Sequence, residues 1–436
     1  MPSRPNAAVP RSSTALPRTA ERPEPHPRKR CPILRTSDRR PAPLRIAIAA
    51  ETYPPEINGA ATFASRLAAG LAARGHEVHV IAPSASGLPS AREEDGVRVH
   101  RVRSHHWPLH PTWMICLPWQ TGPEVARLLD TIAPDVVHTQ AHFVLGRYAF
   151  SLAAARGIPV VATNHFMPDN VRPYVRAPRP LIDGATALAW KDLRARFQRA
   201  DRITVPTQLA SDLLTQNGFD HPIEAVSCGI DLSSFDEAHA EAQAQTEAQA
   251  AGPQAPSVLF VGRLSQEKHP ETLVEALALT DPAHGLEVRI VGEGDQAPRL
   301  LELAAERGVA ERVHLLGKIS DAQLRREYAR ASFFCMPSTA ELQSIATLEA
   351  LASGLPVVLA DAVALPHLVR DGENGHLFRP REAADLAAKL TSLLTAAPEE
   401  IARMQEASRA LVAVHDIRRT IARYEEIYRE VIAERA

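Results

Sequence analysis

The feature that most constrains the fold of this chain is a repeated alternation of short apolar runs with stretches of helical periodicity. The apolar runs, such as 45–50 (RIAIAA) and 258–262 (VLFVG), are nearly continuous and rich in β-branched residues, as is typical of parallel strands buried on both faces. The stretch 62–75 (TFASRLAAGLAARG) separates two such runs and ends at a glycine, where a helix C-cap is expected. The alternation therefore predicts an α/β fold with doubly wound parallel sheets.

The alternation occurs twice, which predicts two similar Rossmann-like domains. A chain of 436 residues suits two domains of about 150–200 residues with additional segments. Further helices are expected at 121–133, 143–157 and 187–200. The expected divisions are a disordered Pro/Arg-rich tail (1–43), a first domain (44–225), a hinge with a low-complexity Ala/Gln insertion (226–256), a second domain (257–415) and a final helix (416–436) that could cross to the first domain.

Charge and cysteine content exclude several classes of protein. The formal net charge is -2, so bulk charge does not favour a nucleic-acid partner. A basic cluster at 28–30 (RKR) is more typical of a solvated tail than of a contact with lipid or nucleic acid. The four cysteines, Cys31, Cys116, Cys228 and Cys335, show no disulfide-framework or zinc-site spacing, which favours a reduced, cytoplasmic setting.

Membrane contact is expected to be peripheral. No apolar run approaches the roughly 20 residues of a spanning helix, and the N-terminal segment lacks the apolar core of a signal peptide.

The second half carries the candidate binding residues. Gly262 and Arg263 follow the strand at 258–262, and Lys268 lies in the next loop, where open α/β sheets bind ligands. An Arg and a Lys at this edge supply two cations for a diphosphate, although two surface cations would look the same. Gly292 and Gly294 end the next strand, and their spacing fits a tight turn as well as a ligand loop.

Two glutamates eight residues apart, Glu341 and Glu349, form the most informative pattern. We expect a helix to start near Glu341, where a carboxylate suits the positive end of the helix dipole. Glu349 then lies just over two turns along, among apolar neighbours. Because a carboxylate in a packed helix needs a partner, the two hydroxyl donors of a nucleoside ribose are a candidate.

With these motifs the chain resembles the family 4 glycosyltransferases, which have the GT-B fold of two Rossmann-like domains facing each other across a cleft. The resemblance runs from about Arg45 to the C-terminal helix and includes the family's Glu-x7-Glu mark, here Glu341 and Glu349. The family usually reads EGFG after the first Glu, whereas this chain reads ELQS, with Leu342 and Ser344 in place of the glycines. It is similar to the group that acts on lipid acceptors.

The resemblance implies roles for residues of the second domain, which would bind the nucleotide-sugar. Arg263 and Lys268 match the cation pair that neutralises the donor diphosphate. Glu349 would bind the ribose and Glu341 the hydroxyls of the donor sugar. Backbone amides of the loop that contains Ser344 would contact the diphosphate or the sugar.

The resemblance also assigns two residues of the first, acceptor-side domain. Gly59, in PPEINGAAT, matches the glycine loop that meets the donor phosphate and the acceptor. His165 follows the strand IPVVAT and matches a His that faces the reacting sugar. His138 and His142 follow the neighbouring strand and would either line the same site or belong to the core.

The expected activity is hexosyl transfer from a nucleotide-sugar with retention of configuration, with His165, Glu341, Arg263 and Lys268 as the catalytic set. Negative charge builds on the leaving diphosphate, and the two cations can stabilise it. The sequence contains no DxD motif, so no metal or other cofactor is expected. UDP-glucose, UDP-galactose and GDP-mannose remain open as donors.

Two segments of the first half suggest an acceptor at a membrane. Trp107, Trp113 and Trp119 lie in one, and aromatic rings suit both sugars and membrane interfaces. The other, 172–202, is basic with Trp190 and Phe197 interleaved, a pattern that fits anionic lipid but also a core with a solvated face. Its cations are Arg172, Arg176, Arg179, Lys191, Arg194, Arg196, Arg199 and Arg202. We therefore expect a lipid or glycolipid acceptor and peripheral contact with an anionic membrane.

Two alternatives stay open, and a third, an oxidoreductase, does not fit the sequence. A soluble sugar or polysaccharide precursor could replace the lipid, and a protein that binds nucleotide-sugars without turnover would keep the same residues. An oxidoreductase would need G-x-G-x-x-G after the first strand, where this chain reads ETYPPEINGA.

Overall fold

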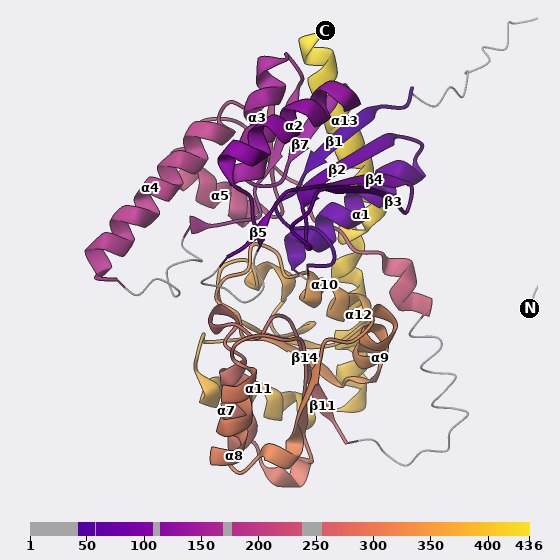
Figure 1. Cartoon of the computed structure of the whole chain (residues 1–436). Coiled ribbons are helices and arrows are strands. Elements are labelled where there is room, and N and C mark those ends of the chain that lie inside the picture. The colour runs from indigo at the N-terminus through magenta and orange to yellow at the C-terminus, as the bar shows by residue number, and fades with distance from the viewer. Residues whose placement is uncertain (1–41, 57, 108–113, 169–176, 238–254) are drawn as a thin grey trace, which may run out of the picture. The chain divides into compact units, whose positions relative to one another are not determined.

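The computed structural model describes residues 42–56, 58–107, 114–168, 177–237 and 255–436. Within these residues the strands form two large sheets and one two-stranded sheet. Residues 43–436 belong to one compact unit, which contains both large sheets. Helices flank the strands throughout, and the predicted α/β class with two doubly wound sheets is confirmed (Figure 1).

The first sheet has the strand order β10-β9-β8-β7-β1-β2-β4-β3, and only the β3–β4 pair is antiparallel among the pairings described. Its strands are β1 (Arg45–Ala49), β2 (Glu77–Pro83), β3 (Ser90–Glu94), β4 (Val97–Val102), β7 (Val136–Thr139), β8 (Val160–Thr163), β9 (Arg202–Val205) and β10 (Ile223–Ala225). The α-helices of this half are α1 (Gly59–Ala73), α2 (Pro118–Ile132), α3 (Val144–Ala155), α4 (Arg179–Phe197) and α5 (Gln208–Gln216). β5 (His105–His106) and β6 (Met114–Ile115) pair in the small sheet.

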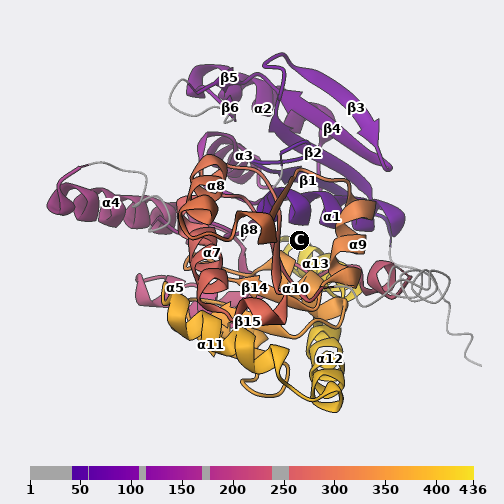
Figure 2. The same ribbon diagram turned by 90° about the horizontal axis from the view of Figure 1, so that it is seen from below.

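The second sheet has the order β13-β12-β11-β14-β15-β16, and every pair of neighbours is parallel. Its strands are β11 (Ser257–Val261), β12 (Glu287–Val291), β13 (Val313–Gly317), β14 (Phe333–Met336), β15 (Val357–Ala360) and β16 (Gly375–Phe378). Its helices are α7 (Pro270–Leu279), α8 (Ala297–Glu306), α9 (Asp321–Arg330), α10 (Ile345–Ala352), α11 (Ala383–Leu394) and α12 (Pro398–Val412), and α13 (Ile417–Arg435) ends the chain. Figure 2 shows α7 beside α11, and these two helices pack together.

The strand order reverses between β1 and β7 in the first sheet and between β11 and β14 in the second. Open α/β sheets bind ligands at the carboxyl ends of the strands beside such a switch point. The topology therefore places the expected binding sites at the carboxyl ends of β1 and β7 in the first sheet and of β11 and β14 in the second.

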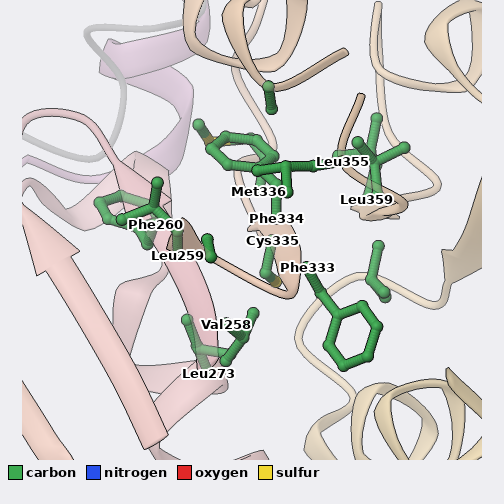
Figure 3. Close-up of a cluster of buried hydrophobic side chains, with 14 of the residues drawn as sticks. Val258, Leu259, Phe260, Leu273, Phe333, Phe334, Cys335, Met336, Leu355 and Leu359 are labelled. Carbon is green, nitrogen blue, oxygen red and sulfur yellow. The ribbon is translucent and has the colours of Figure 1, made fainter. Parts of the chain in front are cut away.

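Apolar side chains fill the second sheet on both faces, as the continuous apolar strands predict. Figure 3 shows Val258, Leu259 and Phe260 of β11 beside Phe333 and Phe334 of β14, all buried. Figure 3 also labels Leu273, Cys335, Met336, Leu355 and Leu359 of the same cluster. The packing holds β11 and β14 in register, and so sets the position of the loops that follow them.

The last helix, α13, packs against the first half of the chain (Figure 1). It contacts α1 and β8, and Tyr424, Tyr428 and Val431 belong to the core on the α1 side of the first sheet. The Tyr428 hydroxyl lies 2.7 Å from His138 Nδ1, and the Tyr424 hydroxyl lies 3.1 Å from Thr163 Oγ1. The chain thus returns to the first sheet after completing the second.

Helices α2 and α4 begin earlier than the sequence pattern predicts. α2 begins at Pro118 rather than near residue 121, and its proline suits the first turn, which leaves N–H groups unpaired. α4 begins at Arg179 rather than near residue 187. Most early residues of α4 are exposed and do not form the apolar stripe of a buried helix face, which explains why the pattern missed them.

Candidate active site

Two loops at the switch point of the second sheet carry the predicted donor-site residues. Arg263 lies in the loop after β11 and Glu341 in the loop after β14. The loops are joined by the backbone, since the Thr339 N–H donates to the Glu267 carbonyl at 3.1 Å. Lys268 ends the single 3-10 turn of the first loop, one residue beyond that carbonyl.

Lys268 and Glu341 form an ion pair across these loops. Lys268 Nζ lies 2.5 Å from Glu341 Oε1, and both side chains are largely buried. Arg263 differs, because it is about half exposed and its Nη2 lies 3.7 Å from Glu267 Oε1. Among the described residues, then, one predicted cation is held by a buried carboxylate and the other extends towards solvent.

The glycines at the end of β12 have a structural purpose. A Cβ on Gly292 would lie 1.9 Å from the Gly262 carbonyl oxygen, and one on Gly294 would lie 2.1 Å from the Leu264 carbonyl oxygen. Gly292 also has a φ of 138°, which L side chains rarely adopt. These glycines let the end of β12 pack against the loop that contains Arg263.

The helix that carries Glu349 begins later than predicted. The expectation of a start near Glu341 is wrong, because α10 begins at Ile345 and residues 337–344 form a loop. Ser344 is the N-cap, and its Oγ accepts from the Thr347 N–H at 3.2 Å. Ser344, one of the residues that replace the family's glycines, thus starts the helix.

Leu342 and Gln343 attach this loop to the first half of the chain. Leu342 is buried within the core of the first sheet, and its carbonyl accepts from Thr207 Oγ1 at 3.0 Å. Gln343 Oε1 accepts from the Cys228 N–H at 2.7 Å, and Gln343 Nε2 donates to Ser227 Oγ at 3.0 Å. The ELQS sequence therefore contacts the first half through the side chain of Leu342, which a glycine lacks, and through Gln343, at the position of the family's Phe.

Glu349 is buried on α10 with a partner at each carboxylate oxygen. Arg66 Nη2 of α1 donates to Oε1 at 2.9 Å, and the Tyr328 hydroxyl of α9 donates to Oε2 at 3.2 Å. The sequence predicts that Glu349 has a dedicated partner, and in the structure Arg66 and Tyr328 are its partners. Sequence reasoning missed Arg66 and Tyr328, since no spacing signal links Arg66 to a residue 283 positions away.

Gly59 is the first residue of α1 and lies beside the start of α10. A Cβ on Gly59 would contact Ile345 Cδ1 at 3.6 Å, an ordinary van der Waals distance. The preceding Asn58 caps α1, because its Oδ1 accepts from the Ala61 N–H at 2.8 Å. The first turns of α1 and α10 therefore meet, and bring Gly59 close to the helix of Glu349.

His165 follows β8 on the side of the sheet covered by α1. Its ring lies 4.8 Å from that of Phe63, and its buried Nε2 has no hydrogen-bond partner among the described residues. Burial lowers the pKa of His165 to about 4, so the imidazole is neutral near pH 7.

The other two histidines are placed differently from His165. His138 is fully buried and bonded through both ring nitrogens to Tyr428 and Thr163, so it belongs to the core. His142 is buried beside Phe143 and Phe166, on the side of the first sheet that bears α3.

The aromatic and basic segments divide between core and surface. Trp190 and Phe197 are buried, whereas Trp119 is 70% exposed. Arg179, Lys191 and Arg199 are exposed cations of the basic segment. Trp113, Arg172 and Arg176 lie outside the described residues, as do most of the predicted tail and of the Ala/Gln insertion.

Comparison with known proteins identifies the class. The model of the Glycosyltransferase Family 4 domain matches residues 57–234, and that of Glycosyl transferases group 1 matches residues 242–411. A GDP-mannose-dependent alpha-mannosyltransferase of Mycolicibacterium smegmatis is 32% identical over 337 residues, which cover 77% of this chain and 84% of that protein. The chain belongs to the family 4 and group 1 glycosyltransferases and is a glycosyltransferase with the GT-B fold.

Two further comparisons extend this result. An alpha-monoglucosyldiacylglycerol synthase of Acholeplasma laidlawii is 28% identical over 353 residues, which cover 78% of this chain and 86% of that protein. The structure of sucrose-phosphate synthase from Thermosynechococcus elongatus superposes with a TM-score of 0.75 at 21% identity, covering 89% of this chain and 99% of that chain. That structure supports the fold.

The described residues show neither a membrane-spanning helix nor a cluster of metal-ligating side chains. No helix there combines the length and apolar character that crossing a membrane requires. In the same part of the chain, no group of three or more His, Cys, Asp or Glu side chains is arranged to hold a metal ion.

Proposed function

We propose that this protein transfers a hexosyl group from a UDP- or GDP-linked donor to a membrane lipid or glycolipid, with retention of anomeric configuration and without a metal. The observation that carries the proposal is the buried Lys268–Glu341 pair at the switch point of the second sheet, with Glu349 buried on the helix that follows. A cation fixed at this edge suits a diphosphate, and two carboxylates suit the hydroxyls of a sugar and a ribose.

The donor chemistry follows from where charge develops. As the bond between the sugar and the diphosphate breaks, negative charge grows on the leaving oxygens, and fixed cations stabilise it. Lys268 supplies such a cation in a largely buried position, and Glu341 holds its ammonium in place. Arg263 is free to move to the phosphates, since its 3.7 Å contact with Glu267 is long for a hydrogen bond.

The acceptor side of the reaction is assigned to the first half. His165 is neutral near pH 7, and its Nε2 has no hydrogen-bond partner among the described residues. This nitrogen can therefore form a hydrogen bond with a hydroxyl of the sugar or of the acceptor. Gly59 keeps the first turn of α1 free of a side chain beside α10. A donor phosphate could approach the α1 amides there.

The names of the relatives support the donor and acceptor classes. The M. smegmatis protein is named for GDP-mannose, and the A. laidlawii protein for a glucosyl diacylglycerol. We therefore propose a nucleotide-sugar donor and a lipid acceptor for this chain. Cys116, Cys228 and Cys335 are buried and unpaired, which fits a reducing, cytoplasmic setting.

Helix α4 supports contact with the membrane surface. Its buried residues, Trp190, Leu193 and Phe197, all lie in its C-terminal half. Leu181 and Leu188, 65% and 66% exposed, share one face of the exposed N-terminal half at a spacing of two turns. Lys191, three residues after Leu188 on the same helix, is an exposed cation. Apolar side chains next to cations are typical of helices that lie in an anionic interface.

A donor screen tests the proposed activity. The purified full chain would be mixed with UDP-glucose, UDP-galactose or GDP-mannose and with mixed-lipid vesicles in the presence of EDTA, and nucleotide diphosphate release would be followed. We expect vesicle-dependent release with one donor, lost in Arg263→Ala/Lys268→Ala and kept in the control Arg299→Ala/Lys389→Ala on α8 and α11. Binding of every donor without release would instead indicate an inactive nucleotide-sugar-binding protein.

A vesicle sedimentation assay tests the membrane contact. We expect Leu181→Glu/Leu188→Glu to reduce binding to anionic vesicles about tenfold or more, because each Leu that leaves the interface loses roughly 1.5–3 kcal/mol of burial. The matched control is Leu279→Glu/Leu301→Glu, two leucines of the second half that are 60% and 55% exposed. Equal vesicle binding by both double variants and the wild type would exclude α4 as the contact. Activity on a soluble acceptor that needs no vesicles would replace the lipid proposal.

A further inference from the structure

Each carboxylate oxygen of Glu349 has a protein partner in the structure. Arg66 Nη2 lies 2.9 Å from Oε1 and the Tyr328 hydroxyl lies 3.2 Å from Oε2. Glu349 itself is 7% exposed. Each oxygen could accept a further bond, but the burial of Glu349 leaves little room, so the two hydroxyls of a ribose reach this carboxylate when one of these partners moves away.

Tyr328 is the fixed partner of the two. It is fully buried, and burial and the charge of Glu349 raise its pKa well above the ordinary value, so its hydroxyl keeps its proton. The same hydroxyl lies 3.1 Å from the Ala346 carbonyl, which it can bond if Glu349 turns away. Both contacts lie within the second half, so Tyr328 does not depend on the first half.

Arg66 is the movable partner. It extends from α1 of the first half, its side chain is about one-third exposed, and only one of its amino groups bonds Glu349. Its other amino group, Nη1, is buried without a hydrogen-bond partner among the described residues. A buried N–H without an acceptor is unfavourable, so this guanidinium is under-satisfied in the ligand-free protein.

The surroundings of Arg66 point to an anionic acceptor for Nη1. Arg66 lies on the same helix as Gly59, whose position meets the start of α10 at Ile345. A guanidinium favours planar, bidentate contact with phosphate or carboxylate oxygens. The diphosphate of the proposed donor supplies such oxygens near the ribose that would occupy Glu349.

We infer that Arg66 is a donor-positioning residue that exchanges partners on binding. In the donor-free protein it neutralises Glu349, and when the ribose hydroxyls bind Glu349, the guanidinium moves to the donor diphosphate and joins Arg263 and Lys268 there. The inference rests on the proposed donor site. Arg66 then competes with the nucleoside ribose for Glu349, which weakens nucleoside binding, and contacts the diphosphate, which strengthens nucleoside diphosphate binding.

These opposite effects give a test that a merely structural ion pair would not pass. Equilibrium binding of uridine, guanosine, UDP and GDP would be measured calorimetrically for the wild type and for Arg66→Met. We expect the variant to bind the matching nucleoside about threefold tighter, because Glu349 no longer has a cationic partner. We expect it to bind the nucleoside diphosphate about tenfold more weakly, as for loss of one charge-assisted phosphate contact.

The chain offers a matched control on the same helix. Arg74 caps the end of α1, and its Nε lies 2.6 Å from Glu425 Oε2, so Arg74→Met also removes an Arg–Glu pair. We expect the ratio of nucleoside to nucleoside diphosphate affinity to stay within about twofold of the wild type in this control. Equal changes in both affinities for Arg66→Met, or no change in either, would overturn the inference.

A second variant covers the case in which Arg66→Met fails to fold. Arg66→Lys keeps the charge but loses the bidentate fork, so the ratio of nucleoside to nucleoside diphosphate affinity should rise above that of the wild type, in the direction expected for Arg66→Met. An unchanged ratio in Arg66→Lys would also count against the exchange of partners. A wild type that binds neither UDP nor GDP would contradict the proposed function itself, and this inference with it.

Discussion

At the scale of single residues, the candidate site depends on charged side chains whose partners come from distant parts of the chain. Lys268 and Glu341 are 73 positions apart, and Arg66 and Glu349 are 283 positions apart. The residue types could be singled out from the sequence, because cations and carboxylates near strand ends indicate ligand chemistry. Their pairing could not, because it depends on how the two sheets and their helices pack.

The proposed role of Lys268 leads to a prediction about catalytic efficiency. We expect Lys268→Met to reduce kcat/KM for the donor by about 10²–10³-fold, since it removes a preorganised charge from the leaving diphosphate. Lys389→Met, on α11, is the control for loss of a lysine elsewhere in the second half. Steady-state kinetics over a range of donor concentrations measure both, and similar losses in the two variants would contradict the role of Lys268.

The burial of His165 leads to a prediction about how the reaction rate depends on pH. Because burial holds its pKa at about 4, the imidazole stays neutral from pH 8 down to about 5, and its titration should not shape the rate in this range. We expect His165→Gln to reduce kcat by about 10²-fold or more while donor affinity stays within a few-fold. A rate that falls around pH 6.5 in the wild type but not in His165→Gln would show instead that the histidine is accessible and titrates normally.

At the scale of elements, the loop before α10 explains the departure from the family's usual glycines. Leu342 and Gln343 contact the first half, and Ser344 caps the helix. The sequence showed that the glycines were missing but not what replaced their function. The expected helix start at Glu341 was wrong for the same reason, because tertiary contacts of 342 and 343 hold these residues in a loop.

Gln343 gives a prediction for this element. We expect Gln343→Ala to lower the free energy of unfolding by about 1–2 kcal/mol, because it leaves the Cys228 N–H without its acceptor. Gln208→Ala removes an exposed bond to Asp212 and serves as the control, with a change within about 0.5 kcal/mol. Denaturant titration compares the two. A Gln343→Ala protein as stable as the control would mean that the loop does not depend on this contact.

At the scale of the whole molecule, the repeated α/β alternation was enough to predict two doubly wound sheets. The strands are continuous apolar runs, and such runs are a strong local signal. The path of α13 was left open, because an amphipathic helix shows that it has a buried face but not which surface covers it. In the structure Tyr424 and Tyr428 of α13 complete the core of the first sheet.

Buried histidines make the stability of the whole molecule depend on pH. Burial lowers the pKa to about 4 for His100, His142, His165 and His415, and to about 3 for His138. The unfolded chain binds protons at these sites near pH 6.5 and the folded protein does not, so stability is lost as pH falls from 6.5 towards 4. Glu51 acts in the opposite direction, because burial raises its pKa to about 7 and folding favours its protonated form.

We therefore expect a net loss of stability on mild acidification. Between pH 7 and pH 5 each fully buried histidine lowers the free energy of unfolding by roughly 2 kcal/mol. Several such losses exceed the gain in stability from the protonation of Glu51. The free energy of unfolding should fall between pH 7 and pH 5, and His138→Gln should flatten this dependence. Denaturant titrations at several pH values measure both, and a stability that rises on acidification would contradict the burial of these histidines.

We propose that the donor nucleotide binds at the switch point of the second sheet through Glu349. The most direct test is calorimetric titration of UDP and GDP into the wild type, Glu349→Gln and a control, Glu327→Gln, in which a glutamate paired with Arg289 in the same half is changed. We predict that the wild type binds one nucleotide, that Glu349→Gln weakens that binding by about 10–100-fold, and that Glu327→Gln leaves it within a few-fold. Equal affinity in the wild type and in Glu349→Gln would place the nucleotide elsewhere and contradict the account.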